Sequence, residues 1–296
     1  MAENPTEQRL ILKDGRTLGF AEYGDPKGEP FLEFHGCPSS RLEARNYDEA
    51  GKKLGARVLG IDRPGFGIST YVKGFRIVDW PADVIEFANA LGLKRFVVAG
   101  ISSGSPYALA CARFIPERLK GCAMVSGVPP LVVNGEKLDA SQFLMAEELI
   151  QARLAKTVPF AARAIYRYIV WQIRKDPVAA IQKVKGHTAN DIEILKRPEV
   201  REHFRNMIVE GSRNGVRGPV DSIALELTDW GFSLSDITMQ VNIWHGEFGY
   251  MVFPAGAKFV ASKLRNPNLH IVPNVGHMSL VVDRAEDVLR ELLAAN

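Results

Sequence analysis

The 296-residue sequence lacks the features that mark several large classes of protein. Its three cysteines are few and odd in number, which argues against a disulfide scaffold and favours a reducing compartment, so we expect a cytoplasmic protein. No run of about 18 apolar residues is present, so we expect no transmembrane helix and no membrane partner. Residues 1–9 are polar and unlike a signal peptide.

Charge and short motifs exclude further classes. The formal net charge is only +3 and no basic run is interleaved with aromatic residues, so we expect no nucleic-acid partner. H-E-x-x-H, paired C-x-x-C and P-loop patterns are absent, and Gly65-Phe66-Gly67 lacks the third glycine of a dinucleotide fingerprint. The sequence therefore predicts no metal and no cofactor, a small-molecule substrate as the partner, and a monomer or homodimer.

What the sequence does contain is an alternation of strand and helix patterns. Hydrophobic residues make up 46% of the chain, enough for a large core. A hairpin is expected over residues 8–23, because Asp14-Gly15 is a strong turn signal. Beyond it, apolar runs predict buried strands that alternate with helices, which indicates an α/β fold with a mostly parallel sheet covered on both faces. The expected strands are 31–34, 57–61, 96–99 and 119–125, and the expected helices are 41–53, 79–91 and the segment after Ser105.

The stretch Gly100-Ile101-Ser102-Ser103-Gly104 lies between one of these strands and an Ala-rich helix pattern. G-x-S-x-G in the context strand, turn, helix predicts a nucleophile elbow, a strained turn that projects the hydroxyl of Ser102 from the end of the sheet. The positions two before and two after the serine must be small, and both are glycine. The N–H of Ser103 opens the helix and can face a developing negative charge.

The alternation stops between about residues 130 and 228 and then resumes. Four helical patterns rich in aromatics fill this region, after which strands at 241–245 and 269–272 and helices at 256–264 and 285–293 are expected. We predict a core domain made of residues 1–129 and 229–296 and an inserted helical cap, or lid, at 130–228. Its aromatics are predicted to line a pocket above Ser102. The four helical patterns are 141–154, 160–174, 177–185 and 198–211, and the aromatics are Phe143, Phe160, Tyr166, Tyr168, Trp171 and Phe204.

Several short motifs, in their order and spacing, resemble the α/β-hydrolase fold superfamily, in particular its capped, esterase-like and proline-iminopeptidase-like branch. The motifs are His35-Gly36-Cys37-Pro38, Asp62 to Ser69, Asp79-Trp80, the elbow at Ser102, Trp244-His245-Gly246-Glu247 and Gly276-His277-Met278-Ser279. The resemblance implies the α/β-hydrolase fold with an inserted helical cap. It does not identify a substrate, because this fold hosts many chemistries.

The resemblance also implies roles for individual residues. Ser102 matches the nucleophile, and His277, expected in the loop after the last strand, matches the base that takes the serine proton and returns it. The backbone N–H groups of Cys37 and Ser103 match the oxyanion hole, while the Cys37 thiol is expected to be incidental. His35 is expected to shape its own turn, and the Asp62-Arg63 pair to hold the neighbouring loop.

The sequence departs from the family at the acid of the catalytic triad. The family aspartate falls on Gly249, or on Tyr250, and the strand end at 125–128 offers no acid either. Three explanations stay open: Glu247 reaches the histidine, a Ser–His dyad performs chemistry that needs a weaker base, or the site only binds a ligand. Without a carboxylate the pKa of His277 is expected near the ordinary value of about 6.5. Replacing Gly249 by Asp is expected to raise esterase activity.

The sequence thus predicts an enzyme that acts on a small, largely apolar ester or other carbonyl compound, by hydrolysis through Ser102 and His277. A non-hydrolytic lyase, isomerase or cyclisation catalyst using the same incomplete triad is the first alternative. A ligand-binding module with a decayed site is the second.

Overall fold

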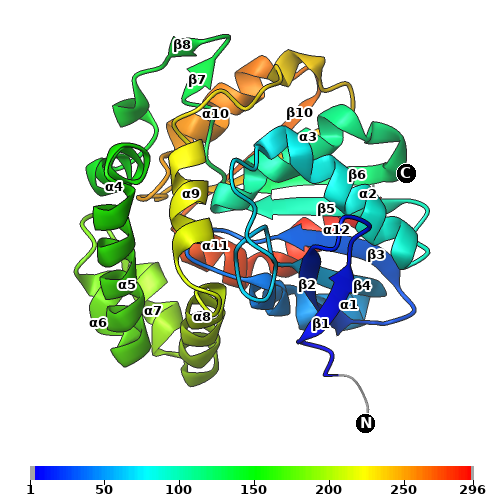
Figure 1. The fold of residues 1–296 in the computed structure, drawn as a ribbon, viewed down its shortest axis with the longest axis horizontal. Helices are drawn as coiled ribbons and strands as arrows, with labels where there is room; N and C mark the ends of the chain where they lie inside the picture. The colour runs from blue at the N-terminus through cyan, green and yellow to red at the C-terminus, as the bar shows by residue number, and fades with distance from the viewer. Residues whose placement is uncertain (1–3, 295–296) are drawn as a thin grey trace.

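An eight-stranded sheet forms the centre of the computed structural model, which describes residues 4–294 (Figure 1). The strand order is β1-β2-β4-β3-β5-β6-β9-β10. The strands are β1 (Gln8–Ile11), β2 (Thr17–Gly24), β3 (Glu29–Phe34), β4 (Ala56–Ile61), β5 (Phe96–Ile101), β6 (Leu119–Val125), β9 (Val241–Gly246) and β10 (Pro267–Val272).

The six strands from β4 to β10 pair in parallel, whereas β1 and β2 form the predicted hairpin and β2 pairs antiparallel with β4. Every residue of β5 is buried, as expected of a central parallel strand with apolar side chains on both faces. The carboxyl ends of the parallel strands meet at one edge, where ligands bind in open α/β sheets. The predicted α/β-hydrolase fold, with its mostly parallel sheet, is confirmed.

Helices cover both faces of the sheet, and each set buries its own apolar cluster. On one face lie α2 (Trp80–Ala90), α3 (Ser105–Phe114) and α10 (Pro254–Lys263). On the other lie α1 (Asp48–Leu54), α11 (His277–Asp283) and α12 (Ala285–Ala294). Short 3-10 helices connect these elements at Arg41–Tyr47, Ile77–Asp79, Ser102–Gly104, Pro116–Arg118, Ala140–Gln142 and Leu234–Asp236.

The region from 130 to 228 is mainly helical, and its helices lie beyond the carboxyl ends of the strands (Figure 1). The helix at 198–211 has the expected bounds, but α7 and α9 and a small hairpin were not expected. The division of the chain into a core and a cap stays a prediction. The elements are β7 (Val132–Val133), β8 (Glu136–Lys137), α4 (Ala146–Thr157), α5 (Pro159–Lys175), α6 (Pro177–Gln182), α7 (Ala189–Lys196), α8 (Pro198–Gly211) and α9 (Arg217–Leu225).

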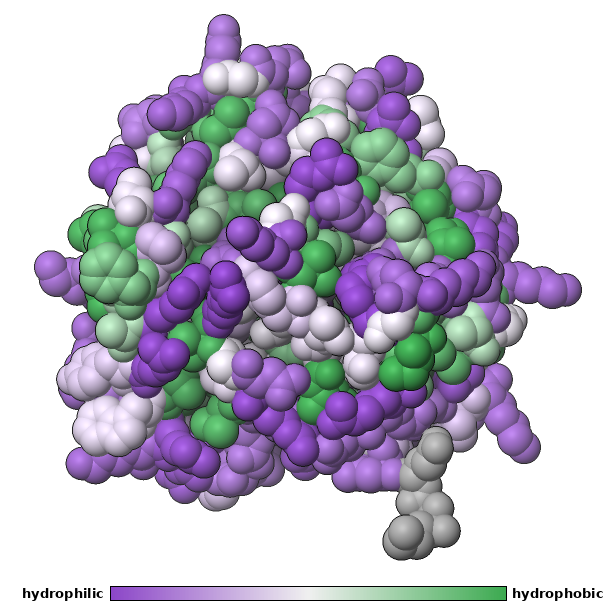
Figure 2. All heavy atoms as spheres, viewed as in Figure 1, coloured by the Kyte–Doolittle hydropathy of each residue, from purple (hydrophilic) through white to green (hydrophobic). Residues whose placement is uncertain are grey.

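The aromatic residues of this region do not line a pocket as a group, which corrects the prediction. Phe160, Tyr168 and Trp171 are 75%, 56% and 55% exposed, and only Tyr166 and Phe204 line the cavity described below. The reason is the helical period of α5. Positions 162, 166, 169 and 173 face inward, so the aromatics between them face solvent. Figure 2 shows apolar and intermediate surface on the side where α4 and α5 lie.

None of the helices within residues 4–294 combines the length and the apolar character needed to cross a bilayer.

Candidate active site

Ser102 occupies the predicted elbow between β5 and α3, with a backbone φ of +49°. A non-glycine residue rarely adopts this left-handed conformation, so the turn is strained. Both flanking glycines are required by space, because a Cβ on Gly104 would lie 1.9 Å from the carbonyl oxygen of Phe34. A Cβ on Gly100 would lie 2.4 Å from the carbonyl oxygen of Gly104. The surrounding backbone therefore holds the serine in place.

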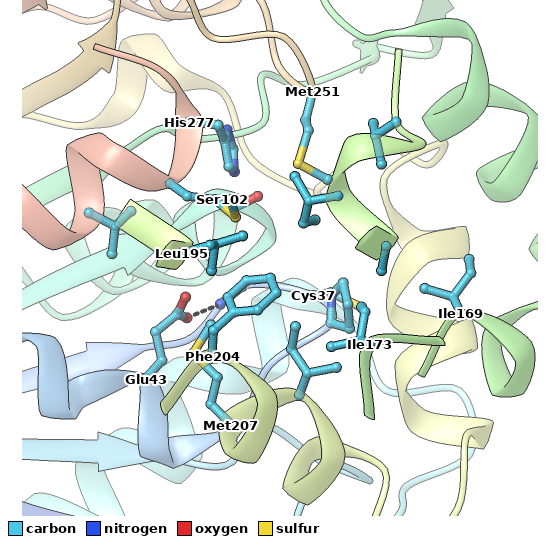
Figure 3. Close-up of a pocket in the computed structure, with 18 of the residues that line it drawn as sticks. Cys37, Glu43, Ser102, Ile169, Ile173, Leu195, Phe204, Met207, Met251 and His277 are labelled. Atoms are coloured by element: carbon cyan, nitrogen blue, oxygen red, sulfur yellow. Dashed lines mark hydrogen bonds between the residues drawn. The ribbon is translucent and has the colours of Figure 1, made fainter. Parts of the chain in front are cut away.

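A cavity of about 330 Å³ opens between the sheet edge and helices α5 to α8, and Ser102 lies on its wall (Figure 3). Most of the lining is apolar. Aliphatic and methionine side chains predominate, so the cavity suits a small ligand with few polar groups. The apolar lining includes Ile169, Ile173, Ile181, Leu195, Phe204, Met207, Met251 and Met278.

His277 lies beside Ser102 at the cavity wall (Figure 3), so the structure brings the predicted pair together. The sequence predicts His277 in a loop, whereas in the structure it is the first residue of helix α11. No direct hydrogen bond joins the two side chains in the described part of the chain, which is frequent in sites without substrate.

One ring nitrogen of His277, Nδ1, is buried and finds no hydrogen-bond partner among residues 4–294. Burial lowers the pKa of His277 to about 4, below the value near 6.5 expected from the sequence. The expectation was wrong because it considered only the missing carboxylate, whereas the surrounding apolar side chains also disfavour the charged ring.

Glu247, the tentative acid, is not brought to His277. Its side chain is exposed and accepts a hydrogen bond from the backbone N–H of Asn274, at 3.1 Å. The other candidate position, Gly249, is enclosed: a Cβ there would lie 2.6 Å from the carbonyl oxygen of Val252 and 2.7 Å from His245 Nε2. The buried imidazole of His245 therefore fills the space beside Gly249.

The loop opposite the elbow is held by buried polar side chains. His35 Nε2 accepts from the N–H of Arg63 at 3.1 Å, so its Nδ1 carries the proton and donates to the carbonyl of Gly36 at 2.7 Å. Glu43 Oε2 accepts the Gly36 N–H at 2.6 Å. His35 is thus a structural residue, as expected.

Of the two residues whose backbone N–H groups are proposed for the oxyanion hole, Cys37 lines the cavity together with Ser102, and Ser103 follows Ser102 in the chain. Neither the Cys37 N–H nor the Ser103 N–H donates to a protein acceptor within the described residues. The thiol of Cys37 lies 3.8 Å from both Tyr166 Oη and the carbonyl of Pro219. Burial raises the pKa of this thiol to about 12, so it stays protonated and is a poor nucleophile.

The structure adds two carboxyl groups that the sequence analysis missed, the buried Glu226 and the half-buried Glu148. Ser103 Oγ donates to Glu226 Oε1 at 2.6 Å, and Glu148 of α4 lines the cavity. Burial raises the pKa of Glu226 to about 7 and, with repulsion from Glu226, that of Glu148 to about 8. A signal was present, since Glu226 interrupts the apolar run 223–227 at the end of a helix.

The backbone of His277 is fixed from two sides, which the sequence analysis also missed. Asp191 of α7 is fully buried, and its carboxylate accepts the N–H of His277 at 3.1 Å and that of Ser279 at 2.7 Å. Ser126, after β6, donates from its hydroxyl to the carbonyl of His277 at 3.2 Å. The sequence Thr188-x-x-Asp191 resembles a helix-capping pattern and could have indicated α7.

No group of three or more His, Cys, Asp or Glu side chains is placed to hold a metal ion in residues 4–294.

Comparisons with known proteins agree with the fold. A model of the family described as alpha/beta hydrolase fold matches residues 29–283. A bifunctional esterase/perhydrolase of Acinetobacter calcoaceticus is 27% identical over 96% of this chain and 98% of its own length. A non-heme chloroperoxidase of Burkholderia pyrrocinia is 26% identical over 97% and 98% of the two chains.

Among solved structures, a thermophilic esterase of Thermogutta terrifontis superposes with a TM-score of 0.70 at 21% identity, over 97% of this chain and 98% of that one. At that identity the likeness shows the fold alone. The family match, which covers most of the chain, shows more: this protein is a member of the α/β hydrolase fold family.

Proposed function

We propose that the protein hydrolyses small, largely apolar esters, with Ser102 as nucleophile and His277 as general base. The observation that carries the proposal is the strained φ of +49° at Ser102, because the glycines around it are placed to hold that one residue at the cavity wall. A relative named as a bifunctional esterase/perhydrolase supports the same class of substrate.

In this mechanism the oxygen of Ser102 attacks the ester carbonyl while His277 Nε2 takes the serine proton. The N–H groups of Cys37 and Ser103 donate to the oxyanion of the tetrahedral intermediate. His277 then returns its proton to the leaving alcohol, and a water molecule deacylates the serine by the same steps. Because both N–H groups lack protein acceptors, they are free for this use.

The base is weak in this protein. A pKa of about 4 keeps His277 neutral at pH 7, so the ring can accept a proton, but the imidazolium that forms has no carboxylate beside its Nδ1 atom. Loss of the correctly bonded acid costs a serine protease about 10⁴-fold in kcat. We therefore expect slow hydrolysis, fastest for esters with good leaving groups.

A non-hydrolytic reaction is the second candidate, favoured by Glu148 and Glu226. Glu148, with a pKa of about 8, lines the same cavity, and Glu226, with a pKa of about 7, accepts the Ser103 hydroxyl, so both can donate or accept protons near neutral pH. In that case Ser102 would bind the substrate without forming a covalent intermediate.

Covalent labelling with a fluorophosphonate probe tests the choice. We expect mass spectrometry to locate the probe on Ser102 and Ser102→Ala to remove both the label and p-nitrophenyl ester turnover, by at least about 10³-fold. Ser262→Ala is the control, because Ser262 is an exposed serine of α10 that does not line the cavity, and this variant should keep the label. An unlabelled parent protein, or full turnover by Ser102→Ala, would reject the nucleophile and favour the non-hydrolytic reaction.

A further inference from the structure

Asp191 is a buried carboxylate that the proposed mechanism does not use, and it contacts the residue on which that mechanism depends. It projects from α7, in the helical region, to the first turn of α11, which begins at His277. Its two oxygens accept the N–H groups of His277 and Ser279 separately, at 3.1 and 2.7 Å. These are backbone donors at a helix start, which have no partner within the helix itself.

The approach of α7 to this helix start depends on Gly276. A Cβ at Gly276 would lie 2.5 Å from Asp191 Oδ2 and 2.5 Å from Thr188 Oγ1, too close for any other residue without a shift. Thr188 caps α7 and its hydroxyl accepts the Asp191 N–H at 3.1 Å. The side chain of Asp191 is thus fixed at its own backbone as well as at its two acceptor oxygens.

The ring of His277 has no comparable support. Its Nδ1 atom is unpartnered, Gly249 supplies no carboxylate, and Glu247 bonds to Asn274 instead. Among residues 4–294, the hydrogen bonds that tie His277 to Asp191 and Ser126 involve its backbone: its N–H donates to Asp191 and its carbonyl accepts from Ser126. The direction of the imidazole toward Ser102 therefore depends on where the backbone is held.

We propose that Asp191 is a positioning residue that fixes the backbone of His277 and so aligns its imidazole with Ser102, which attaches helix α7 to the general base. This inference rests on the proposed function of Ser102 and His277. It assigns to a carboxylate of the helical region the orienting task that a triad acid performs on the ring. Displacement of α7 would then move the His277 imidazole out of line with Ser102 and reduce activity without any change at Ser102.

Asp191→Ala should reduce the rate of fluorophosphonate labelling at Ser102, and kcat for p-nitrophenyl esters, by at least about tenfold. KM should change little, because Asp191 does not line the cavity. Asp176→Ala is the matched control: Asp176 also caps a helix of this region, through the N–H of Ala179, but makes no bond to α11. Its labelling rate should equal that of the parent.

Histidine NMR provides a readout that does not depend on turnover, with the His277 signal assigned from His277→Gln. In the parent we expect the His277 ring to titrate at about pH 4, and in Asp191→Ala we expect its pKa to rise as the released segment admits water. Asp191→Asn keeps the volume and one acceptor oxygen. If Asp191→Ala does not fold, Asp191→Asn takes its place, and we expect smaller changes in the labelling rate and in the His277 pKa.

The outcomes separate the two proposals. If Asp191→Ala and Asp191→Asn label at the parent rate and the His277 signal is unmoved, the positioning role is wrong while the nucleophile stands. If the parent is never labelled but the His277 signal shifts in the Asp191 variants, the proposed hydrolysis is wrong while the positioning of the His277 backbone by Asp191 is supported. Equal losses in Asp191→Ala and Asp176→Ala would reduce the effect to general loosening of the helices and overturn the inference.

Discussion

The serine side of the site, which is Ser102 and its elbow, is held more firmly than the histidine side, which is His277 at the start of α11. On the serine side, Ser102 is held in a strained turn by close backbone packing, and Ser105 Oγ donates to the carbonyl of Gly100 at 2.8 Å. On the histidine side, His277 has two backbone contacts and an orphaned ring nitrogen. Strain persists only where its surroundings enforce it, so the packing around Ser102 supports the role proposed for this residue as nucleophile.

The difference indicates which half limits the chemistry. In the proposed mechanism the hydroxyl must be placed, the oxyanion held and the imidazolium stabilised, and the groups proposed for the first two tasks are the better fixed. Position 249 offers no carboxylate for the third task, and His245 fills the space beside Gly249. Changes on the histidine side should therefore alter the strength of the base, while changes on the serine side should alter whether any covalent step occurs.

Gly249→Asp is the most direct attempt to equalise the two sides, and we now expect it to fail. The new Cβ would meet the Val252 carbonyl at 2.6 Å and His245 Nε2 at 2.7 Å, so in place of the gain in esterase activity expected from the sequence we expect a loss of stability. Overpacking of this kind costs about 1–3 kcal/mol. Urea unfolding measures the loss.

Gly249→Ala carries the same Cβ without the charge and should lose a similar amount. If Gly249→Asp unfolded at the same urea concentration as the parent and its Ser102 were labelled ten times faster, the inference that position 249 is too enclosed for a side chain would be wrong.

Glu226→Gln tests the buried carboxyl on the serine side. The pKa of Glu226 is about 7 in the folded protein against an ordinary 4.5, so between those values the folded protein holds a proton that the unfolded chain has released. Stability therefore falls as pH rises through this window, and removing the carboxyl removes that fall. We expect Glu226→Gln to be about 3 kcal/mol more stable than the parent at pH 8 and nearly equal at pH 4.

Glutamine keeps an acceptor for the Ser103 hydroxyl, so the hydrogen bond itself is preserved. Glu136→Gln, at an exposed position of β8, is the control and should leave the pH profile of stability unchanged. A profile of Glu226→Gln parallel to that of the parent would contradict the raised pKa.

Ser102→Gly tests the strain at the elbow. Glycine reaches a φ of +49° without a Cβ penalty, whereas alanine retains it, so both variants lose the label but only glycine relieves the turn. We expect Ser102→Gly to be about 1 kcal/mol more stable than Ser102→Ala in urea unfolding. Equal stabilities would mean that the turn carries no strain.

Local pattern was enough to predict the sheet and the elbow, because each depends on signals within a few residues. The pairing of Ser102 with His277 was implied by the resemblance to the hydrolase family and not by local pattern. Burial of polar groups was harder. Glu33 stands in the apolar run Phe31-Leu32-Glu33-Phe34, and it is fully buried, with a pKa raised by burial and by repulsion from Glu43. An acid inside a predicted central strand was a readable signal that periodicity alone did not use.

Contacts between distant segments could not be predicted at all. Asp191 and His277 are separated by 86 positions, and nothing local to either residue indicates the other. The same holds for Ser103 and Glu226, which are 123 positions apart. The prediction that the aromatics of residues 130–228 line the pocket failed for a related reason. Composition predicted apolar helices, but the packing of α5 determines which of its faces meets the cavity.

Glu247→Gln should have the smallest effect, and it completes the comparison of the two sides. The carboxylate of Glu247 is exposed and accepts the N–H of Asn274, so glutamine can keep that bond through its amide oxygen. We expect labelling of Ser102 and kcat to stay within about twofold of the parent, because a solvent-facing group remote from His277 Nδ1 stabilises no charge there. A large loss would revive Glu247 as the triad acid and require the loop at 247–253 to rearrange when substrate binds. No loss would leave the histidine side with backbone support alone, which is the condition under which Asp191 matters most.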